Sequence, residues 1–343
     1  SQYRQIGLIQ IADVTGQYGV SFFVALVNGV IVEILAALTL GPEHRRARLR
    51  RFSTGAVAAA LILAGLLGYG HWRLEQETVR PGPVIGVVQQ DFRIALGGSD
   101  ATPEKMLQSH VEMTRERLLD TGCELVVWPE TVLPEALNPE MLNLDLGSLS
   151  RADLLCLGAI IGLPRQDAET WSNEGLRRLL DKYLHSGGPL PLEDGRVAQI
   201  VSSRQHAEDV SALAAKLGCP ILAGGTTVHR NPDPLHTWDR WVRRNSLLWF
   251  DGEGFPEWKY AKRHLVPFSE FVPFKKSWPW LYVQLRKLIP PGMPQLEPGG
   301  RIEPIRLTGE EGATWRLATA ICYEGTFARV CRALIAPQGR KEA

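Results

Sequence analysis

The chain has 343 residues, of which 45% are hydrophobic and 22% charged, so it can bury a large core and hold one big domain with a smaller one. Its formal net charge of +1 argues against a global nucleic-acid-binding surface. The five cysteines form no Cys-x-x-Cys pair and have no metal-ligand spacing, which argues against a disulfide framework and a zinc site.

Residues 1–75 differ from the rest and are predicted to be a membrane region. Segments 19–40 and 55–72 are nearly all apolar, with Glu33 the single charge in the first, and both approach the ~20 residues that a membrane-crossing helix needs. A signal-like or buried helix is the alternative for the first, but no small-residue cleavage pattern is present. The arginine-rich stretch 41–51 is expected to be a short cytoplasmic loop, which would place the following domain on the outer side.

From residue 80 onward strand-like and helix-like segments alternate, which predicts a layered α/β catalytic domain over 80–343. Strands are expected at 84–89, which reads as buried, and at 125–128, 220–224 and 245–250, and helices at 103–119 and 207–217. Residues 140–205 interrupt the alternation as an insertion rich in Pro, Gly and mixed charge. A short helix is expected there near 173–183, and a loop of this length is usually functional or disordered.

Three residues beside extended apolar segments have the chemistry that acyl transfer requires: Glu130, Lys262 and Cys322. A thiol attacks well only as the thiolate, so a catalytic cysteine needs a base and a cation beside it. In this scheme Cys322 is the nucleophile and Glu130 is the proton acceptor, made more basic by apolar neighbours. Lys262, with a backbone N–H near Tyr323, would stabilise the developing oxyanion. We expect the three to meet at one edge of a sheet.

Each assignment has a structural alternative. A lysine in a basic run usually lies on a solvated face, and a lone glutamate can cap a turn. An isolated cysteine is more often a small core residue, which is the interpretation for Cys123, Cys156, Cys219 and Cys331. The order and neighbours of the three candidates favour catalysis instead. His264 is interpreted as structural, because a thioester scheme does not require an imidazole.

Three ordered motifs carry a family resemblance. VVWPET at 126–131, YAKRHLVPFSEFVP at 260–273 and ICYEGTF at 321–327, after membrane helices, resemble the apolipoprotein N-acyltransferases, the membrane-bound branch of the nitrilase superfamily. The resemblance implies an α-β-β-α sandwich on the periplasmic, outer face of the bacterial inner membrane. It implies transfer of a fatty acyl chain from a phospholipid to the N-terminal amine of a diacylglyceryl-cysteine lipoprotein. The reaction passes through a cysteine thioester and needs no metal or other cofactor.

The resemblance also implies supporting residues. Glu270 matches a second glutamate that assists the lysine, and Tyr323 and Glu324 match residues that support the cysteine. Ser269 stands where the family has glycine, which adds a Cβ where a permissive backbone conformation could be needed but removes no catalytic group. Segment 274–293 interleaves aromatic and aliphatic residues with lysine and arginine, which suits the lipid interface, although an arm packed on its own domain explains the pattern equally well. If it moves, this segment could be a lid that admits a phospholipid tail.

Only 21 residues follow Cys322, whereas the sandwich of this family continues and then closes with a membrane helix. We therefore expect a chain truncated at both ends, with the sandwich incomplete at its C-terminus and an open sheet edge. Two alternatives to the acyltransferase stay open. One is a membrane-tethered carbon–nitrogen hydrolase, which would use the same residues and pass the acyl group to water. The other is a non-catalytic fragment of the acyltransferase.

Overall fold

The computed structural model describes residues 4–39, 41–77, 81–92, 94–95, 98–99, 101–134, 136–162, 170–191, 197–234, 239–288, 295–300, 304–309 and 312–335. Parts of the predicted insertion, at 163–169 and 192–196, and of segment 274–293, at 289–294, lie outside these residues. The chain divides into two compact units. One comprises 1–81 with 326–329, and the other comprises 82–325 with 330–343.

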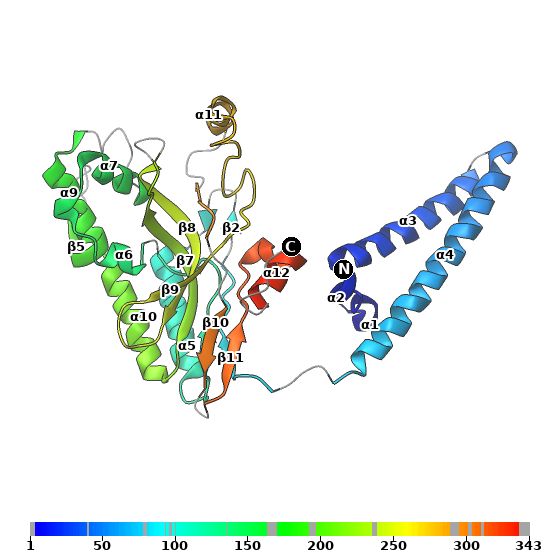
Figure 1. Ribbon diagram of the computed structural model, residues 1–343, viewed down its shortest axis with the longest axis horizontal. Helices are drawn as coiled ribbons and strands as arrows, with labels where there is room; N and C mark the ends of the chain where they lie inside the picture. The colour runs from blue at the N-terminus through cyan, green and yellow to red at the C-terminus, as the bar shows by residue number, and fades with distance from the viewer. Residues whose placement is uncertain are drawn as a thin grey trace. The chain divides into compact units, whose positions relative to one another are not determined.

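The first unit is a helical hairpin with two short helices before it (Figure 1). Its elements are α1 (Ile6–Ile9), α2 (Ala12–Thr15), α3 (Gln17–Thr39) and α4 (Pro42–Leu74). Two stretches, Gln17–Thr39 and His44–Leu74, are long and apolar enough to cross a membrane, with mean hydropathies of 2.2 and 1.8. Only 11% and 6% of their most apolar windows are buried, so most of this apolar surface faces outward.

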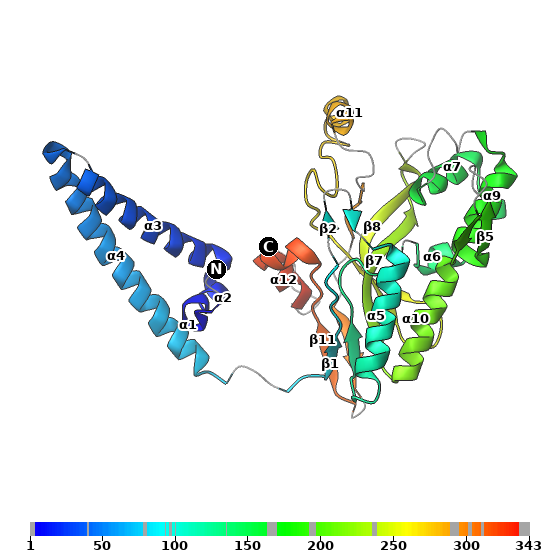
Figure 2. The same cartoon turned by 180° about the vertical axis from the view of Figure 1, so that it is seen from behind.

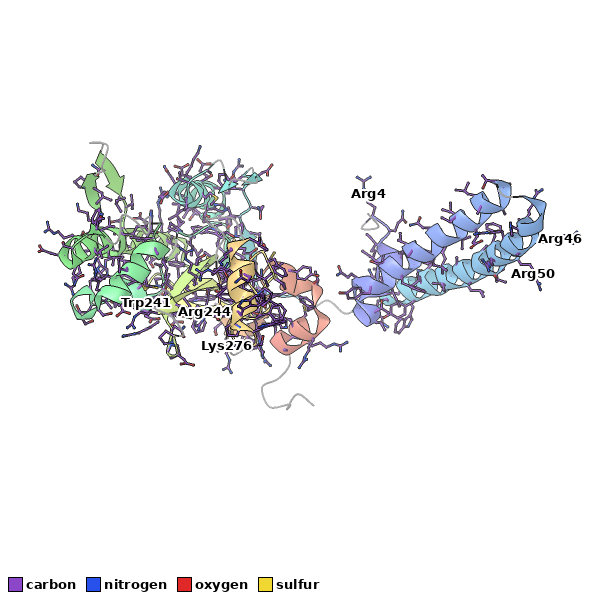
Figure 3. The ribbon with its side chains drawn as sticks, turned by 90° about the horizontal axis from the view of Figure 1, so that it is seen from above. Arg4, Arg46, Arg50, Trp241, Arg244 and Lys276 are labelled. Carbon is purple, nitrogen blue, oxygen red and sulfur yellow. The ribbon has the colours of Figure 1, made fainter. Side chains whose placement is uncertain are left out.

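The predicted arginine-rich loop at 41–51 is wrong, because helix α4 begins at Pro42 and continues through these residues. Proline is favourable in the first turn of a helix, and arginine, alanine and leucine are good helix formers. Arg46 and Arg50 project outward from the start of α4 (Figure 3). Arg48 also explains the single charge within the first apolar segment, because its Nη1 lies 3.2 Å from Glu33 Oε2.

The second unit is built on a five-stranded sheet in the order β1-β4-β7-β8-β9. The strands are β1 (Ile85–Val87), β4 (Leu125–Val127), β7 (Ile221–Arg230), β8 (Trp241–Phe250) and β9 (Glu257–Ala261). The first three are mutually parallel, and β8 and β9 continue the sheet antiparallel. Helices α5 (Pro103–Leu118) and α10 (Ser203–Leu217) cover one face (Figures 1 and 2). The main apolar core lies between these helices and the sheet.

Predicted and observed elements agree best where the apolar period is long. The helix expected at 103–119 is confirmed as α5, whereas β7 and β8 each run ten residues and exceed the predicted strands. The expectation of a buried strand at 84–89 is wrong. Strand β1 is three residues long at the edge of the sheet, with Ile85 41% and Val87 70% exposed.

Residues 140–205 are an ordered subregion wherever the structure describes them. Its elements are α6 (Pro139–Leu142), η1 (Leu146–Ser148), α7 (Arg151–Ile160), α9 (Asn173–Asp181), η2 (Lys182–Ser186), β5 (Gly188–Pro191) and β6 (Val197–Ile200). Helix α9 confirms the short helix expected near 173–183. These elements surround a second apolar core that includes Val228 and Trp241 of the sheet. The insertion therefore packs against the C-terminal end of β7 and the N-terminal end of β8.

The remaining elements follow β9 or lie beside the sheet. They are β2 (Ile94–Ala95), β3 (Gly98–Ser99), α11 (Pro279–Lys287), β10 (Ile305–Thr308), β11 (Thr314–Leu317), η4 (Cys322–Thr326) and α12 (Ala328–Ile335). Helix α11 projects away from the end of the sheet (Figures 1 and 2), and Lys276 lies just before it (Figure 3). The chain from the end of β11 to Cys322 lies across the sheet face opposite α5 and α10, where the two surfaces enclose a cavity.

Candidate active site

Glu130 follows β4 directly, and neighbouring backbone holds it in place. The carbonyl of Pro129 accepts a hydrogen bond from Gly224 N at 3.1 Å. A Cβ on Gly224 would lie 2.2 Å from the carbonyl oxygen of Glu130, so β7 approaches this residue as closely as a glycine allows. The Glu130 side chain is 31% exposed, which is less desolvated than its Trp-Pro neighbourhood predicted. Its Oε1 accepts a hydrogen bond from Asn245 Nδ2 at 2.6 Å.

Lys262 follows β9 and is fully buried. Its backbone N donates to Asn245 O at 2.7 Å, and its own carbonyl accepts from Gly299 N at 2.8 Å. Its Nζ lies 2.7 Å from Glu270 Oε1 and 3.5 Å from Glu130 Oε1. Burial opposes the charged amine, but the Glu270 hydrogen bond and the charges of Glu130 and Glu270 outweigh it, so the pKa of Lys262 is raised. The ammonium is therefore held as a cation between two carboxylates.

Glu270 lies in a turn that returns the chain toward the sheet. Its Oε2 accepts from Val266 N at 2.9 Å while its Oε1 binds Lys262, so both oxygens are used. Ser269 does not need the conformational freedom of a glycine in this loop. The left-handed conformation is taken by Phe268, with φ of 62°, and Ser269 is outside that region.

Cys322 begins the 3₁₀ turn η4 after the chain leaves β11. Its φ of 52° lies in the left-handed region, which costs a residue with a side chain roughly 1–2 kcal/mol. The thiol is exposed, and Cys322 lines the same cavity as Glu130. It also lies close enough to Lys262 for its negative form to favour the ammonium. The backbone thus places Cys322 at the wall of a cavity that Glu130 also lines.

The carboxylate of Glu324 is fully buried and joins the cysteine turn to the lysine segment. Its Oε1 accepts from the backbone N of Arg263 at 2.8 Å and of His264 at 2.9 Å, and its Oε2 accepts from Ile321 N at 3.1 Å. The hydroxyl of Tyr260 donates to both oxygens at 3.0 Å. Burial and the nearby Glu324 charge raise the pKa of Tyr260 well above its usual range, so this donor keeps its proton.

The other candidates divide by environment. Tyr323 is 48% exposed beside Cys322, and the His264 ring is 45% exposed with Nδ1 3.9 Å from Glu324 Oε1.

Cys156 and Cys219 are buried, which agrees with their structural interpretation, and burial raises the pKa of the Cys219 thiol to about 11. Among the described residues no group of three His, Cys, Asp or Glu side chains could hold a metal ion.

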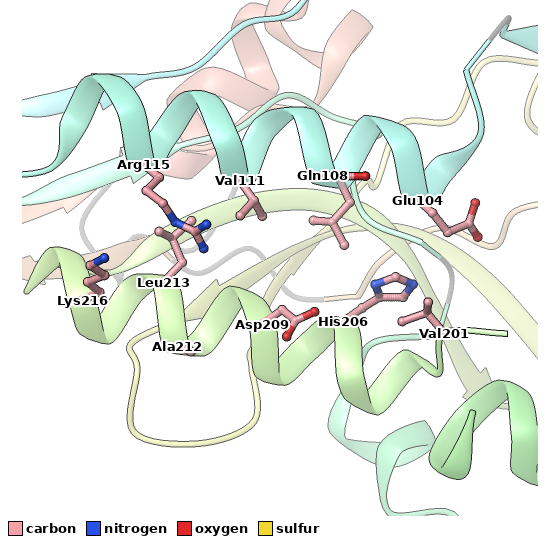
Figure 4. A pocket seen from close by; sticks show the side chains of 11 residues that line it. Glu104, Gln108, Val111, Arg115, Val201, His206, Asp209, Ala212, Leu213 and Lys216 are labelled. Atoms are coloured by element: carbon pink, nitrogen blue, oxygen red, sulfur yellow. The ribbon is translucent and has the colours of Figure 1, made fainter. Parts of the chain in front are cut away.

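Two of the cavities that described residues line flank the sheet, one on each face. The one at Cys322 and Glu130 has a volume of about 360 Å³ and is lined mainly by aliphatic residues of β1, β4, β7, β8 and segment 317–321. A larger groove of about 530 Å³ runs between α5 and α10, with Glu104 and His206 toward one end and Arg115 and Lys216 toward the other (Figure 4). The larger groove lies on the opposite face from the thiol, so the smaller cavity is the one that can hold a reacting group.

Asn245 is a residue of this site that sequence reasoning missed. It touches Glu130 through its side chain and Lys262 through its carbonyl, yet it was interpreted only as the start of a strand. One signal was available. Asparagine is depleted in strands, and this one lies inside the ten-residue strand β8, where it pairs with Thr226 of β7.

The domain match is the finding that decides the family. Residues 85–341 match the carbon-nitrogen hydrolase family, which is about three quarters of the chain. The chain belongs to the carbon-nitrogen hydrolase family. The nitrilase-like mixed α/β fold that the motifs implied is therefore confirmed, with Glu130, Lys262 and Cys322 all inside the matched region.

Curated relatives also carry the name that the motifs suggested. "Apolipoprotein N-acyltransferase" of Rhodopirellula baltica is 23% identical over 333 residues, covering 94% of this chain and 50% of the relative. The protein of that name from Geobacter metallireducens is 24% identical over 98% of this chain and 48% of its own length. "Apolipoprotein N-acyltransferase 2" of Treponema pallidum is 24% identical over 95% and 50%. The resemblance is confirmed, and the chain spans about half the length of the curated relatives it matches.

Proposed function

We propose that this carbon-nitrogen hydrolase family member is the catalytic part of an N-acyltransferase. It would move a fatty acyl chain from a phospholipid to the N-terminal amine of a diacylglyceryl-cysteine lipoprotein. The observation that carries the proposal is Lys262, a fully buried cation held 2.7 Å from Glu270 and 3.5 Å from Glu130, next to the cavity that Cys322 lines. Burying a charge is costly, and this arrangement suits a site that must stabilise negative charge on sulfur and oxygen.

In the first half of the reaction the Glu130 carboxylate takes the proton of the Cys322 thiol. The thiolate then attacks the ester carbonyl carbon of the phospholipid, and the oxyanion is stabilised by the Lys262 ammonium and a backbone N–H near Tyr323. The C–O bond breaks, and the leaving alkoxide takes the proton back from Glu130. The products are a thioester on Cys322 and a lysophospholipid.

In the second half the free amine of the lipoprotein attacks the thioester carbon. Glu130 accepts the proton that the amine loses, the C–S bond breaks, and the thiolate of Cys322 recovers that proton. The product is an amide. These steps use only side-chain and backbone groups of the chain itself, so the proposal includes no metal or other cofactor.

The membrane features of the chain fit a lipid substrate. The two apolar helices would anchor the catalytic unit in the bacterial inner membrane, with the arginine-rich start of α4 in the cytoplasm and the catalytic unit outside. Around α11 the side chains of Trp278 and Trp280 are 54% and 65% exposed and Leu288 is 80% exposed, with Arg286 and Lys287 in its last turn. Exposed aromatic and basic side chains together suit a lipid interface, so α11 is the segment proposed to meet the acyl donor.

A carbon–nitrogen hydrolase is the second candidate, because the family name describes hydrolysis and the same three residues would serve it. The two candidate functions differ in the acceptor of the acyl group, which is an amine for the transferase and water for the hydrolase. Full-length protein in lipid nanodiscs would be incubated with a phospholipid labelled in its acyl chain and a synthetic diacylated lipopeptide. Amide-linked label supports the transferase, and label found only in free fatty acid contradicts it.

The nucleophile is tested in the same assay. A Cys322→Ala variant should form neither the labelled acyl-enzyme nor the amide product, whereas a matched Cys123→Ala variant should keep both. Cys123 is a fair control because it is a half-buried thiol packed at the edge of the main core. Acyl-enzyme formed by Cys322→Ala would show that another residue is the nucleophile.

A further inference from the structure

We infer that Asn245 is a positioning residue that fixes which oxygen of Glu130 receives the proton and holds Glu130 and Lys262 at their working separation. The inference rests on the proposed function, because it assigns a role within the same site. Asn245 lies in the middle of β8, directly opposite Thr226 of β7. It is the one described residue whose side chain binds one member of the candidate triad while its backbone binds another.

The side-chain contact fixes Glu130. Asn245 Nδ2 donates to Glu130 Oε1 at 2.6 Å, a short hydrogen bond to a carboxylate of the kind that is stronger than neutral pairs. The same oxygen lies 3.5 Å from Lys262 Nζ. One hydrogen bond and one ion pair on the same oxygen set the rotation of the carboxylate about its last bond. An exposed glutamate without such a contact would sample several rotamers.

The backbone contact fixes Lys262 relative to the same strand. Lys262 N donates to Asn245 O at 2.7 Å, which continues the ladder that pairs Ser246 with Ala261. Because one residue contacts both partners, the spacing between Glu130 and Lys262 is set through a single point of β8. Any substitution at 245 keeps the backbone bond and removes only the side-chain bond, so the two functions can be separated experimentally.

The geometry leaves Glu130 Oε2 as the working oxygen. Among the residues that the structure describes, Oε1 has the Asn245 hydrogen bond and the Lys262 ion pair, whereas Oε2 has no hydrogen-bond partner. Donors lower the basicity of the oxygen they bind, so the proton from sulfur goes to the oxygen that has none. Asn245 therefore keeps Oε1 occupied and Oε2 available at the cavity shared with Cys322.

Two variants test the inference in the full-length protein. Asn245→Ala removes the donor, and Asn245→Asp keeps the shape but replaces the donor with a second carboxylate. Both should lower kcat for acyl transfer by about 100-fold, the size expected when a catalytic group is misplaced, with KM changed less than about threefold. A second readout needs no lipid substrate. The rate at which iodoacetamide alkylates Cys322, followed peptide by peptide in a mass spectrometer, is measured against pH.

In Asn245→Asp the two facing carboxylates repel, so the acidic limb of the Cys322 alkylation profile should move to higher pH than in the unaltered protein. Ser246→Ala is the matched control, because Ser246 is a buried neighbour on the same strand whose Oγ bonds Thr227 Oγ1 at 2.7 Å on the other face. It should leave the alkylation profile unchanged even if it lowers the melting temperature.

Unchanged alkylation profiles and kcat in both Asn245 variants would overturn the inference, as would an equal effect of Ser246→Ala. Failure of the proposed function has a different signature. In that case the unaltered protein would transfer no acyl chain to the amine, while the alkylation profile of Cys322 would still depend on Asn245.

Discussion

Lys262 shows at the scale of one residue how the site holds a charge that the fold alone would disfavour. Glu270→Gln keeps the shape and a hydrogen-bond acceptor but removes one of the two negative partners of a fully buried ammonium. We expect this variant to lose about 1–3 kcal/mol of unfolding free energy at pH 8, measured by denaturant titration. Glu257→Gln is the control, because its pair with Lys259 is solvent-exposed and should change stability by less than ~0.5 kcal/mol.

The pH dependence of this variant follows from the raised pKa of Lys262. A raised folded-state pKa contributes stability that is fully present below the unfolded value of ~10.4 and is lost as the pH rises through the folded value. The unaltered protein should therefore weaken only at pH above ~10.5. In Glu270→Gln the decline should begin at lower pH. Superimposable stability profiles above pH 9 would contradict this account of the buried cation.

Gly224 provides a second residue-scale prediction, which concerns position instead of charge. A Cβ at this position would meet the Glu130 backbone at 2.2–2.5 Å, so Gly224→Ala must displace Glu130, the proposed base. We expect acyl transfer to fall by about 100-fold, since a shift near 1 Å can cost that much. Gly254→Ala should keep full activity, because nothing lies within 4 Å of its added Cβ. Full transfer by Gly224→Ala would mean that the position of Glu130 is not critical.

The three candidate residues could be proposed from the sequence because each lies in a short motif of recognisable chemistry. The residues that contact them could not be proposed in this way. In the sequence, Glu130, Lys262 and Cys322 each follow or adjoin an apolar run. Asn245 and Gly224 act through contacts with residues 115 and 94 positions away, set by strand pairing that no local pattern encodes. The exposure of Glu130 was misjudged for the same reason, since its surroundings come from β7 and β8.

At the scale of elements, Asp153 attaches the insertion to the sheet. It closes the capping box of α7 with Ser150, and Arg240 lies 2.6 Å from its Oδ1, immediately before β8. Burial opposes the charge, but these bonds outweigh it and lower the pKa of Asp153 to about 2. Its contribution is thus present above pH ~4 and is lost as the pH falls toward 2. Asp153→Asn should cost about 1–3 kcal/mol at neutral pH by thermal or denaturant unfolding, and less at pH 2.

The exposed pair on α9 is the control for that prediction. Arg178 and Glu174 are four residues apart, with side chains 74% and 77% exposed, so Glu174→Ala should change stability by less than ~0.5 kcal/mol. An equal loss from the two substitutions would show that Asp153 is no more than a surface charge. A stability loss independent of pH would show that the charge of Asp153 contributes neither through the ion pair nor through the cap.

Helix α11 carries the element-scale prediction about lipid. Its exposed Trp278 and Trp280 lie with ring centroids 6.4 Å apart, beside Lys275 and Lys276. If this segment meets the acyl donor, hydrogen exchange across 274–288 should slow when the protein moves from detergent into phospholipid nanodiscs. Trp278→Ala with Trp280→Ala should abolish the slowing. Protection that does not change with lipid would favour an arm packed on its own domain.

Helices and strands were predicted correctly where one spacing of apolar residues continues over many residues. They were predicted wrongly where the surroundings in the fold determine the conformation or the burial. Helix α5 has a Thr102 cap, a proline in its first turn and sixteen residues of one pattern, and its bounds were predicted within one residue. Strand β1 reads as buried because its residues are apolar, but it is an edge strand with an exposed face. The arginine stretch has the composition of a loop between two membrane helices and the propensity of a helix, and the helix forms.

At the scale of the whole molecule, the proposed arrangement places the start of α4 and the Cys322 thiol on opposite sides of one bilayer. Arg50 lies in the basic start of α4, which the positive-inside tendency puts in the cytoplasm, and one crossing by α4 then puts Cys322 outside. In intact spheroplasts a membrane-impermeant maleimide should modify Cys322, read at its own peptide because four other thiols are present. In an Arg50→Cys variant, position 50 should react only after the membrane is permeabilised. Reaction of position 50 in intact cells, with Cys322 protected, would reverse the orientation and remove the catalytic unit from the compartment where the proposed acceptor is exposed.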